Sequence, residues 1–196
     1  GSATPNGEDW DLALALATDG LSFKSLLSMV PALYSKDFAG LSADGELRLN
    51  GTVNGVWRAE GEDLPAFELQ LGVKDGRFRY PDLPSDVSDV QLDAHLQHSG
   101  GGPDGIVVDV TRFHLVMAGA PVDGRLQIAH ATTDPALDME VRGNLDLGTL
   151  AQVVPPDPGT SLTGSLDLDL RLKGRVSAFE AQDLDAIEAD GSIEML

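Results

Sequence analysis

Apolar and polar residues alternate strictly over many short segments of the chain, and this alternation has the two-residue period of a β-strand. The clearest segment is residues 166–172, in which every second residue is a leucine and Asp167, Asp169 and Arg171 lie between them. The same pattern recurs in residues 10–17, 67–73 and 90–96, and more briefly at Leu145 and Leu147. Each predicted strand therefore has an aliphatic and a polar face, as in antiparallel sheets that are open to water on one side.

Asp-Gly dipeptides punctuate these segments. They are Asp19-Gly20, Asp44-Gly45, Asp75-Gly76, Asp104-Gly105, Asp123-Gly124 and Asp190-Gly191. Between alternating segments this dipeptide favours a hairpin turn or the edge of a strand. Because the spacing between the dipeptides is irregular, the sequence predicts a meander of unequal strands and not a strict repeat.

Helical periodicity is confined to a few places. Residues 22–34 carry apolar side chains at helical spacing and are interrupted by Pro31, which breaks a helix. Residues 148–153 are long enough for one turn. Residues 177–187 predict a short helix in which Ser177 is the N-cap and Glu180 follows three residues later.

These patterns predict a mainly β protein: a long antiparallel sheet, curved as a groove or closed as a sandwich, with two or three short helices. We expect one domain over residues 3–196, with residues 64–66 as the place where it would divide. Gly1 and Ser2 look like the remnant of a cleaved tag, so we expect the domain to be a segment of a larger protein.

The composition narrows the possible partners. The formal net charge is -19 and no basic stripe offsets it, so the chain is expected to bind neither nucleic acid nor anionic lipid surfaces tightly. Only 5% of the residues are aromatic, which favours an aliphatic surface over a base-stacking one. The four lysines and the many acids fit a salt-adapted source or simply an acidic domain.

Candidate chemistry is weak throughout. There is no cysteine, nucleophile elbow, phosphate loop or zinc-protease motif. His95 and His98 are three residues apart, which places them on opposite faces of a regular strand and argues against a shared metal. Asp167 and Asp169 share a strand face with Arg171, which indicates a solvated ionic surface more than a pair of glycosidase carboxylates. Proline and serine around Asp82, Asp86 and Asp89 favour a turn over a calcium loop.

We therefore expect no enzymatic activity, no cofactor and no metal. The aliphatic stripes leave two possibilities open, because both need the same strands. They form the covered core of a sandwich or barrel, or they line a trough whose apolar face is open to lipid.

One ordered series of short motifs resembles a known family. The series is Gly76-Arg77-Phe78-Arg79-Tyr80-Pro81-Asp82-Leu83-Pro84, then Val87-Ser88-Asp89-Val90-Gln91-Leu92-Asp93, Val108-Asp109-Val110-Thr111-Arg112-Phe113-His114-Leu115, Gly119-Ala120-Pro121-Val122-Asp123, Gly143-Asn144-Leu145-Asp146-Leu147, Leu162-Thr163-Gly164-Ser165-Leu166-Asp167 and Lys173-Gly174-Arg175. Their order over residues 44–196 resembles the region toward the end of bacterial AsmA-family envelope proteins. Each motif is short, and the collinear order carries the resemblance.

The resemblance implies a periplasmic segment of a longer protein that is anchored in the inner membrane of a double-membraned bacterium. AsmA-like proteins are similar to TamB and to chorein-type bridge-like proteins, whose curved sheets form hydrophobic grooves for phospholipids. The implied partners are phospholipid acyl chains, the rest of the protein's own chain and other envelope proteins, and the implied role is outer-membrane biogenesis. The alternative is a structural or interaction module with a fully buried core and no lipid site.

On this interpretation the lipid groove is lined by aliphatic and aromatic residues of the alternating segments. They are Phe67, Leu69, Leu71, Phe78, Leu92, Leu96, Leu115, Leu126, Ile128, Leu145, Leu147, Leu166, Leu168 and Leu170.

Overall fold

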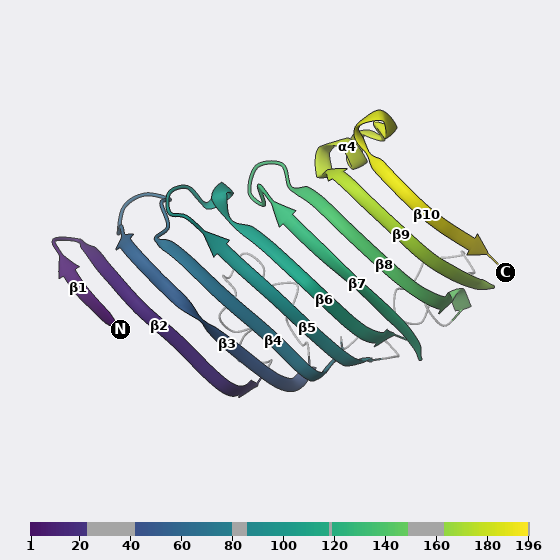
Figure 1. The fold of residues 1–196 in the computed structure, drawn as a ribbon, viewed down its shortest axis with the longest axis horizontal. Helices are drawn as coiled ribbons and strands as arrows, with labels where there is room; N and C mark the ends of the chain where they lie inside the picture. Colours follow the sequence, from purple (N-terminus) through teal and green to yellow (C-terminus); the bar gives the residue numbers. More distant parts are fainter. Residues whose placement is uncertain (23–41, 80–85, 118, 149–162, 196) are drawn as a thin grey trace.

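The fold is a single antiparallel sheet of ten strands that follow one another in chain order (Figure 1). The structure is a computed structural model, and it describes residues 1–22, 42–79, 86–117, 119–148 and 163–195. The strands are β1 (Ser2–Asn6), β2 (Asp9–Ser22), β3 (Ser42–Trp57), β4 (Ala66–Arg79), β5 (Val87–His98), β6 (Val107–Met117), β7 (Ala120–Ala129), β8 (Ala136–Asp146), β9 (Ser165–Arg175) and β10 (Glu188–Met195). The helical elements are η1 (Pro103–Gly105), α4 (Val176–Ala181) and η2 (Leu184–Ala186).

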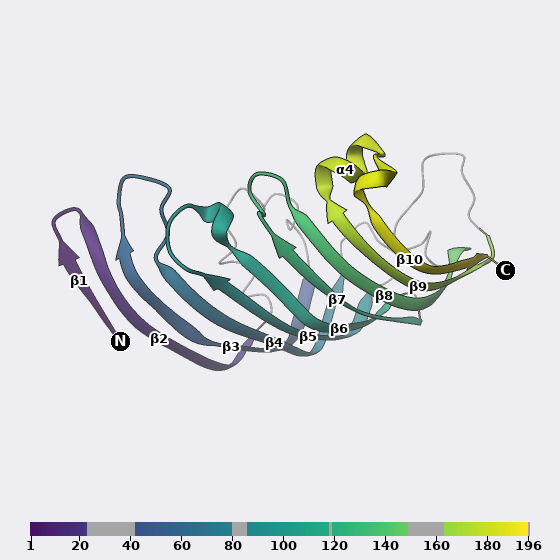
Figure 2. The same cartoon turned by 45° about the horizontal axis from the view of Figure 1, so that its top comes forward.

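The sheet is open. β1 and β10 are its two edges, and extensive contacts between described elements are confined to neighbouring strands and to α4 with β9 and η2. The strands curve along their length (Figure 2). The structure confirms the predicted mainly β fold with a long, curved antiparallel sheet. The alternative prediction, a sheet closed as a sandwich, is wrong.

The surface area supports a single layer. The chain exposes 12088 Å², whereas a compact protein of 20.6 kDa is expected to expose about 8,900 Å². A second packed sheet would have removed much of this surface from water. The amphipathic strands are therefore held mainly by their ladders of backbone hydrogen bonds and by side-chain contacts within one face.

The register aligns the alternation from strand to strand. One row of paired residues on one face is Leu49, Leu71, Ala94, Val110, Leu126, Met139 and Leu172, from β3 to β9. A neighbouring row on the opposite face is Asn50, Gln70, His95, Asp109, Gln127, Asp138 and Lys173. Residues that oppose each other in a ladder point to the same side, so the aliphatic stripes of single strands merge into one continuous face.

Most Asp-Gly dipeptides lie inside strands, so the predicted hairpin turns at these places are wrong. The ladder shifts register at Asp19, at Asp44 and next to Gly76, while Asp123-Gly124 and Asp190-Gly191 are inside β7 and β10. Gly45 and Asp75 have φ values of 133° and 52°, a backbone conformation that bulges use and that glycine and aspartate tolerate. Asp104-Gly105 belongs to η1.

The helix predicted over residues 177–187 is present as two shorter elements, α4 and η2. Ser177 is not the N-cap. Arg175 holds that position without a side-chain bond, and the amide of Ser177 donates to Asp134 of the preceding connection instead. The helix predicted over residues 22–34 and the turn predicted over 148–153 lie outside the described residues, apart from the first residue of each. The place where we expected the domain to divide, residues 64–66, lies mostly in the connection 58–65. This connection joins β3 to β4, and these two strands pair with each other.

Candidate functional site

We call the aliphatic face the side of the sheet to which the apolar rows point. Its members are Leu12, Leu14, Leu16, Leu47, Leu49, Val53, Phe67, Leu69, Leu71, Val73, Phe78, Leu92, Ala94, Leu96, Val108, Val110, Phe113, Leu115, Val122, Leu126, Ile128, Leu137, Met139, Val141, Leu145, Leu166, Leu168, Leu170 and Leu172. The face extends from β2 to β9, and all of these members are apolar.

Thirteen of the fourteen predicted groove residues lie on the aliphatic face. Leu147 is the exception, because β8 ends at Asp146 and Leu147 lies one residue beyond it. The prediction omitted the leucines of β2 and, in β8, Leu137, Met139 and Val141. Their alternation is visible in the sequence, but only the register shows that they extend the same face.

Much of the aliphatic face is only half-buried. The buried apolar residues of the described strands are Leu47, Val73, Val87, Ala94, Val122 and Leu145, and Ala178 is buried in α4. Leu47 has no exposed surface, whereas Leu16 keeps 37% of its surface exposed. The face therefore retains a large area of apolar side chain that water or an apolar ligand can contact.

Glycines on the aliphatic face let larger side chains lie flat across the backbone. A Cβ at Gly124 would be 2.6 Å from the ring of Phe113 and would also meet the backbone of Glu140. At Gly51 the Leu69 side chain occupies the same place, 2.8 Å from where a Cβ would be. The surface that a ligand would meet is therefore made of rings and branched chains that lie over bare backbone.

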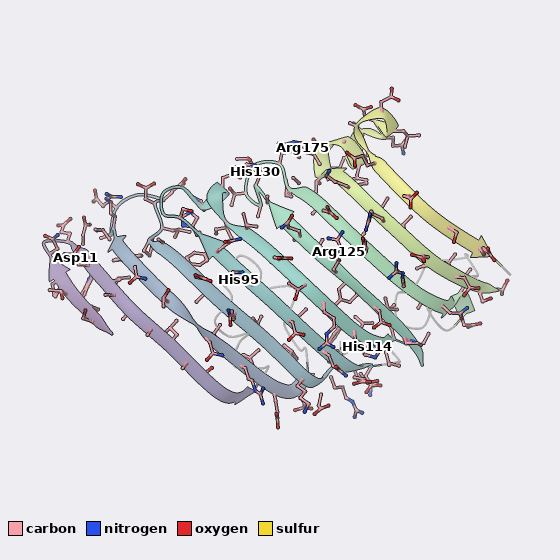
Figure 3. The ribbon with its side chains drawn as sticks, in the orientation of Figure 1. Asp11, His95, His114, Arg125, His130 and Arg175 are labelled. Atoms are coloured by element: carbon pink, nitrogen blue, oxygen red, sulfur yellow. The ribbon has the colours of Figure 1, made fainter. Side chains whose placement is uncertain are left out.

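The opposite face is polar and carries pairs of opposite charge across the strands (Figure 3). Arg125 donates to Asp138 at 3.1 Å and to Glu140 at 3.0 Å, and Arg112 contacts Asp93 at 2.9 Å. Most of these side chains are substantially exposed, so each pair contributes at most about 1 kcal/mol to stability. This face keeps the sheet hydrated.

The acids that the sequence singled out form ionic pairs and hydrogen bonds with neighbouring side chains wherever the structure describes them. Asp167 accepts a hydrogen bond from Asn144, and Asp169 contacts Arg142 at 3.0 Å, so both belong to the ionic pattern of the polar face. Asp86 and Asp89 contact Arg77 and His114, while Asp82 lies outside the described residues. No group of three or more acids and histidines in the described part of the chain is arranged to hold a metal ion.

The connections at one end of the strands are bonded to one another, and we call this end of the sheet the rim. It comprises Gly7, Glu8 and the connections 58–65, 99–106, 130–135 and 176–187, which lie at the same side of the sheet in Figure 1. The first link joins the amide of Ala59 to Asp9 at the start of β2, at 3.3 Å. Leu64 and Gly101 form a two-bond bridge between the next two connections.

His98, at the end of β5, strengthens that bridge. It is the one buried polar residue of the described chain, with 5% of its surface exposed, and its ring stacks on Phe67 with centroids 5.4 Å apart. Nδ1 accepts from the Gly100 amide at 3.2 Å, and Nε2 donates to the Gly102 carbonyl at 3.0 Å. The sequence predicted that His95 and His98 face opposite ways, and this is confirmed: His95 contacts Glu68 on the polar face.

Two aspartates complete the rim, near His130 and Arg175 (Figure 3). Asp104 accepts from His130, Thr132 and Thr133, and these bonds lower its pKa from 3.8 to about 2, with the His130 bond as the largest cause. Asp134 accepts from the amide and hydroxyl of Ser177, which lowers its pKa, with a smaller contribution from the Arg175 charge. Alternation does not reveal such links, because they depend on which connections meet.

A cavity of about 790 Å³ lies beside α4, at the rim ends of β7, β8 and β9. Its walls include Lys173 and Asp138 of the polar rows and several alanines of α4 and η2. Leu137 of the aliphatic face also lines the cavity, so the cavity adjoins that face at the rim. Among the described helices none is long and apolar enough to cross a membrane.

Comparison with known proteins adds no relative. No protein-family model, no curated protein and no solved structure matches the chain. The resemblance to the AsmA family therefore stays a prediction.

Proposed function

We propose that this sheet is a non-catalytic, periplasmic segment that holds phospholipid acyl chains along its aliphatic face and lets them move along it. The observation that carries the proposal is the continuous aliphatic face from β2 to β9, in register and largely half-buried. In this proposal the segment belongs to a membrane-anchored AsmA-like envelope protein and serves outer-membrane biogenesis together with the rest of that protein.

The physical chemistry of the face supports acyl chains as the ligand. Burial of apolar surface contributes about 25 cal/mol per Å², so a lipid chain that covers a few hundred Å² of leucine and valine is stabilised by several kcal/mol. Because this attraction has no preferred direction, a chain can shift along the face without breaking a specific bond. Aligned leucines such as Leu126 and Leu172 offer a surface of this kind from strand to strand.

The test is binding of a photo-crosslinkable phospholipid to delipidated protein. Leu69→Asp places a charge in the middle of the aliphatic face, and Leu168→Asp does so on β9. We expect each substitution to reduce crosslinking at least tenfold, because an acyl chain would have to cover an unpaired carboxylate.

Gln70→Asp is the matched control. It introduces the same charge one residue further along β4, on the polar face, and is expected to leave crosslinking unchanged. Circular dichroism verifies that all variants keep the strand content of the wild type. Equal crosslinking in folded Leu69→Asp and wild type would refute the proposal.

A structural module in envelope assembly is the second candidate. It is favoured by Leu47, Val73 and Val87, which are 0%, 5% and 5% exposed near the end of the strands opposite the rim. If the whole aliphatic face served only as a core, purified protein would carry no phospholipid by native mass spectrometry, and Leu69→Asp would unfold it.

A further inference from the structure

The chain has two tryptophans, and the sheet places them directly opposite each other. Trp10 begins the aliphatic stripe of β2 and Trp57 ends that of β3, at the rim. Their surfaces are 41% and 43% exposed. Since Pro5 of β1 pairs with Trp10, apolar rings form a row across three strands at this corner.

The surroundings of the pair are strongly acidic. Residues 5–11 and 57–63 hold six acids, which are Glu8, Asp9, Asp11, Glu60, Glu62 and Asp63, and one base, Arg58. Arg58 is already paired with Asp63 at 3.0 Å. The corner therefore combines two accessible indole rings with an uncompensated negative field.

The two indole rings and the surrounding acids determine which charge a ligand at this corner should carry. Indole faces attract cations through the ring quadrupole, and nearby carboxylates add to that attraction. The same field repels an anionic headgroup, and it repels a second copy of a chain whose net charge is -19. Charge complementarity therefore selects a cationic group.

We propose that Trp10 and Trp57 form a recognition site for the ammonium group of a zwitterionic phospholipid whose chains lie on the aliphatic face. The inference rests on the proposed function, because Leu12 and Leu14 continue the stripe directly from Trp10. A chain that lies along β2 or β3 brings its headgroup to the rim. The site thus favours ammonium-bearing lipids over anionic lipids.

The first experiment tests the site without any lipid chain, by selectively excited tryptophan fluorescence, which reports on this corner alone because the chain has no other tryptophan. Choline is titrated at constant ionic strength beside its neutral isostere, in which a tert-butyl group replaces the trimethylammonium. We expect a saturable fluorescence change with choline and none with the isostere. Equal responses to both compounds would overturn the proposal.

The second experiment measures selectivity by calorimetric titration with lysophosphatidylcholine and lysophosphatidylglycerol of the same chain length. The double variant Trp10→Leu/Trp57→Leu keeps apolar area but loses both ring faces. We expect its preference for the choline lipid to fall about tenfold relative to the wild type. The double variant with phenylalanine should retain part of the preference. Leu184→Ala, which changes an apolar residue that is 77% exposed on η2, should leave it unchanged.

The outcomes separate this inference from the proposed function. If both lysolipids bind and their affinity ratio is the same in wild type and leucine variant, the headgroup site is overturned while the acyl-chain function stands. If choline binds but neither lysolipid does, the proposed function is overturned, and the lipid origin of the ammonium group with it.

Discussion

The aliphatic face and the rim belong to the same strands but are held together by different interactions. On the aliphatic face the contacts are non-directional, as where Phe113 lies across Gly124. Along the rim the connections are joined by hydrogen bonds and charges, as at His98 and Asp104. The difference indicates a division of roles: the rim fixes how neighbouring strands meet at one end, and the aliphatic face remains a surface without specific bonds.

The largest effect is expected from a methyl group added under a ring. Gly124→Ala would place a Cβ against the Glu140 backbone and 2.6 Å from the Phe113 ring, so β7 or β8 must shift. We expect a loss of about 3 kcal/mol in the free energy of unfolding, measured by urea denaturation. Gly102→Ala is the control, because no atom lies within 4 Å of its Cβ position and its φ is -62°. Equal stability of the two variants would show that the Phe113 contact does not constrain the face.

This contact also marks the limit of what the sequence reveals. Alternation at residues such as Leu126 and Leu168 suffices to predict the strands and the face to which they contribute, because a strand has a fixed period of two. Which residues oppose each other depends on the register, and the bulges at Asp44 and next to Gly76 change it locally. Asp-Gly favours positive φ, and bulges and turns both use this conformation, so the dipeptide alone does not distinguish them.

The rim was missed for a related reason. Ser177 has the local signature of an N-cap, but its amide donates to Asp134, 43 residues earlier in the chain, and the Val176 amide donates to the Pro135 carbonyl. Likewise, nothing in the sequence around His98 indicates that Pro65 and Gly102 would lie beside its ring. Such contacts follow from the meeting of two connections in space, and local patterns do not contain that information.

A smaller effect is expected at the rim when the buried imidazole is replaced. His98→Leu keeps an apolar side chain next to Phe67 but leaves the Gly100 amide without its acceptor and the Gly102 carbonyl without its donor. We expect a loss of about 2 kcal/mol in urea denaturation. His95→Leu, on the polar face of the same strand, removes only an exposed contact with Glu68 and should cost about 0.5 kcal/mol or less. If the two losses are equal, His98 does not hold the rim together.

The smallest effect concerns the charge of Asp104 and should depend on pH. The pKa of Asp104 is lowered from 3.8 to about 2 in the folded protein, so its carboxylate stabilises the fold above pH 3.8 and this contribution is lost as the pH falls toward 2. Asp104→Asn should therefore unfold at a lower temperature than the wild type at neutral pH, by less than His98→Leu does, and the gap should close between pH 4 and pH 2. Asp185→Asn, at an exposed position of η2, is the control and should show no such gap. Because Asp134 is present in all three proteins, its own titration cancels in the comparison. A gap for Asp104→Asn that stays constant down to pH 2 would mean that the carboxylate charge does not stabilise the rim.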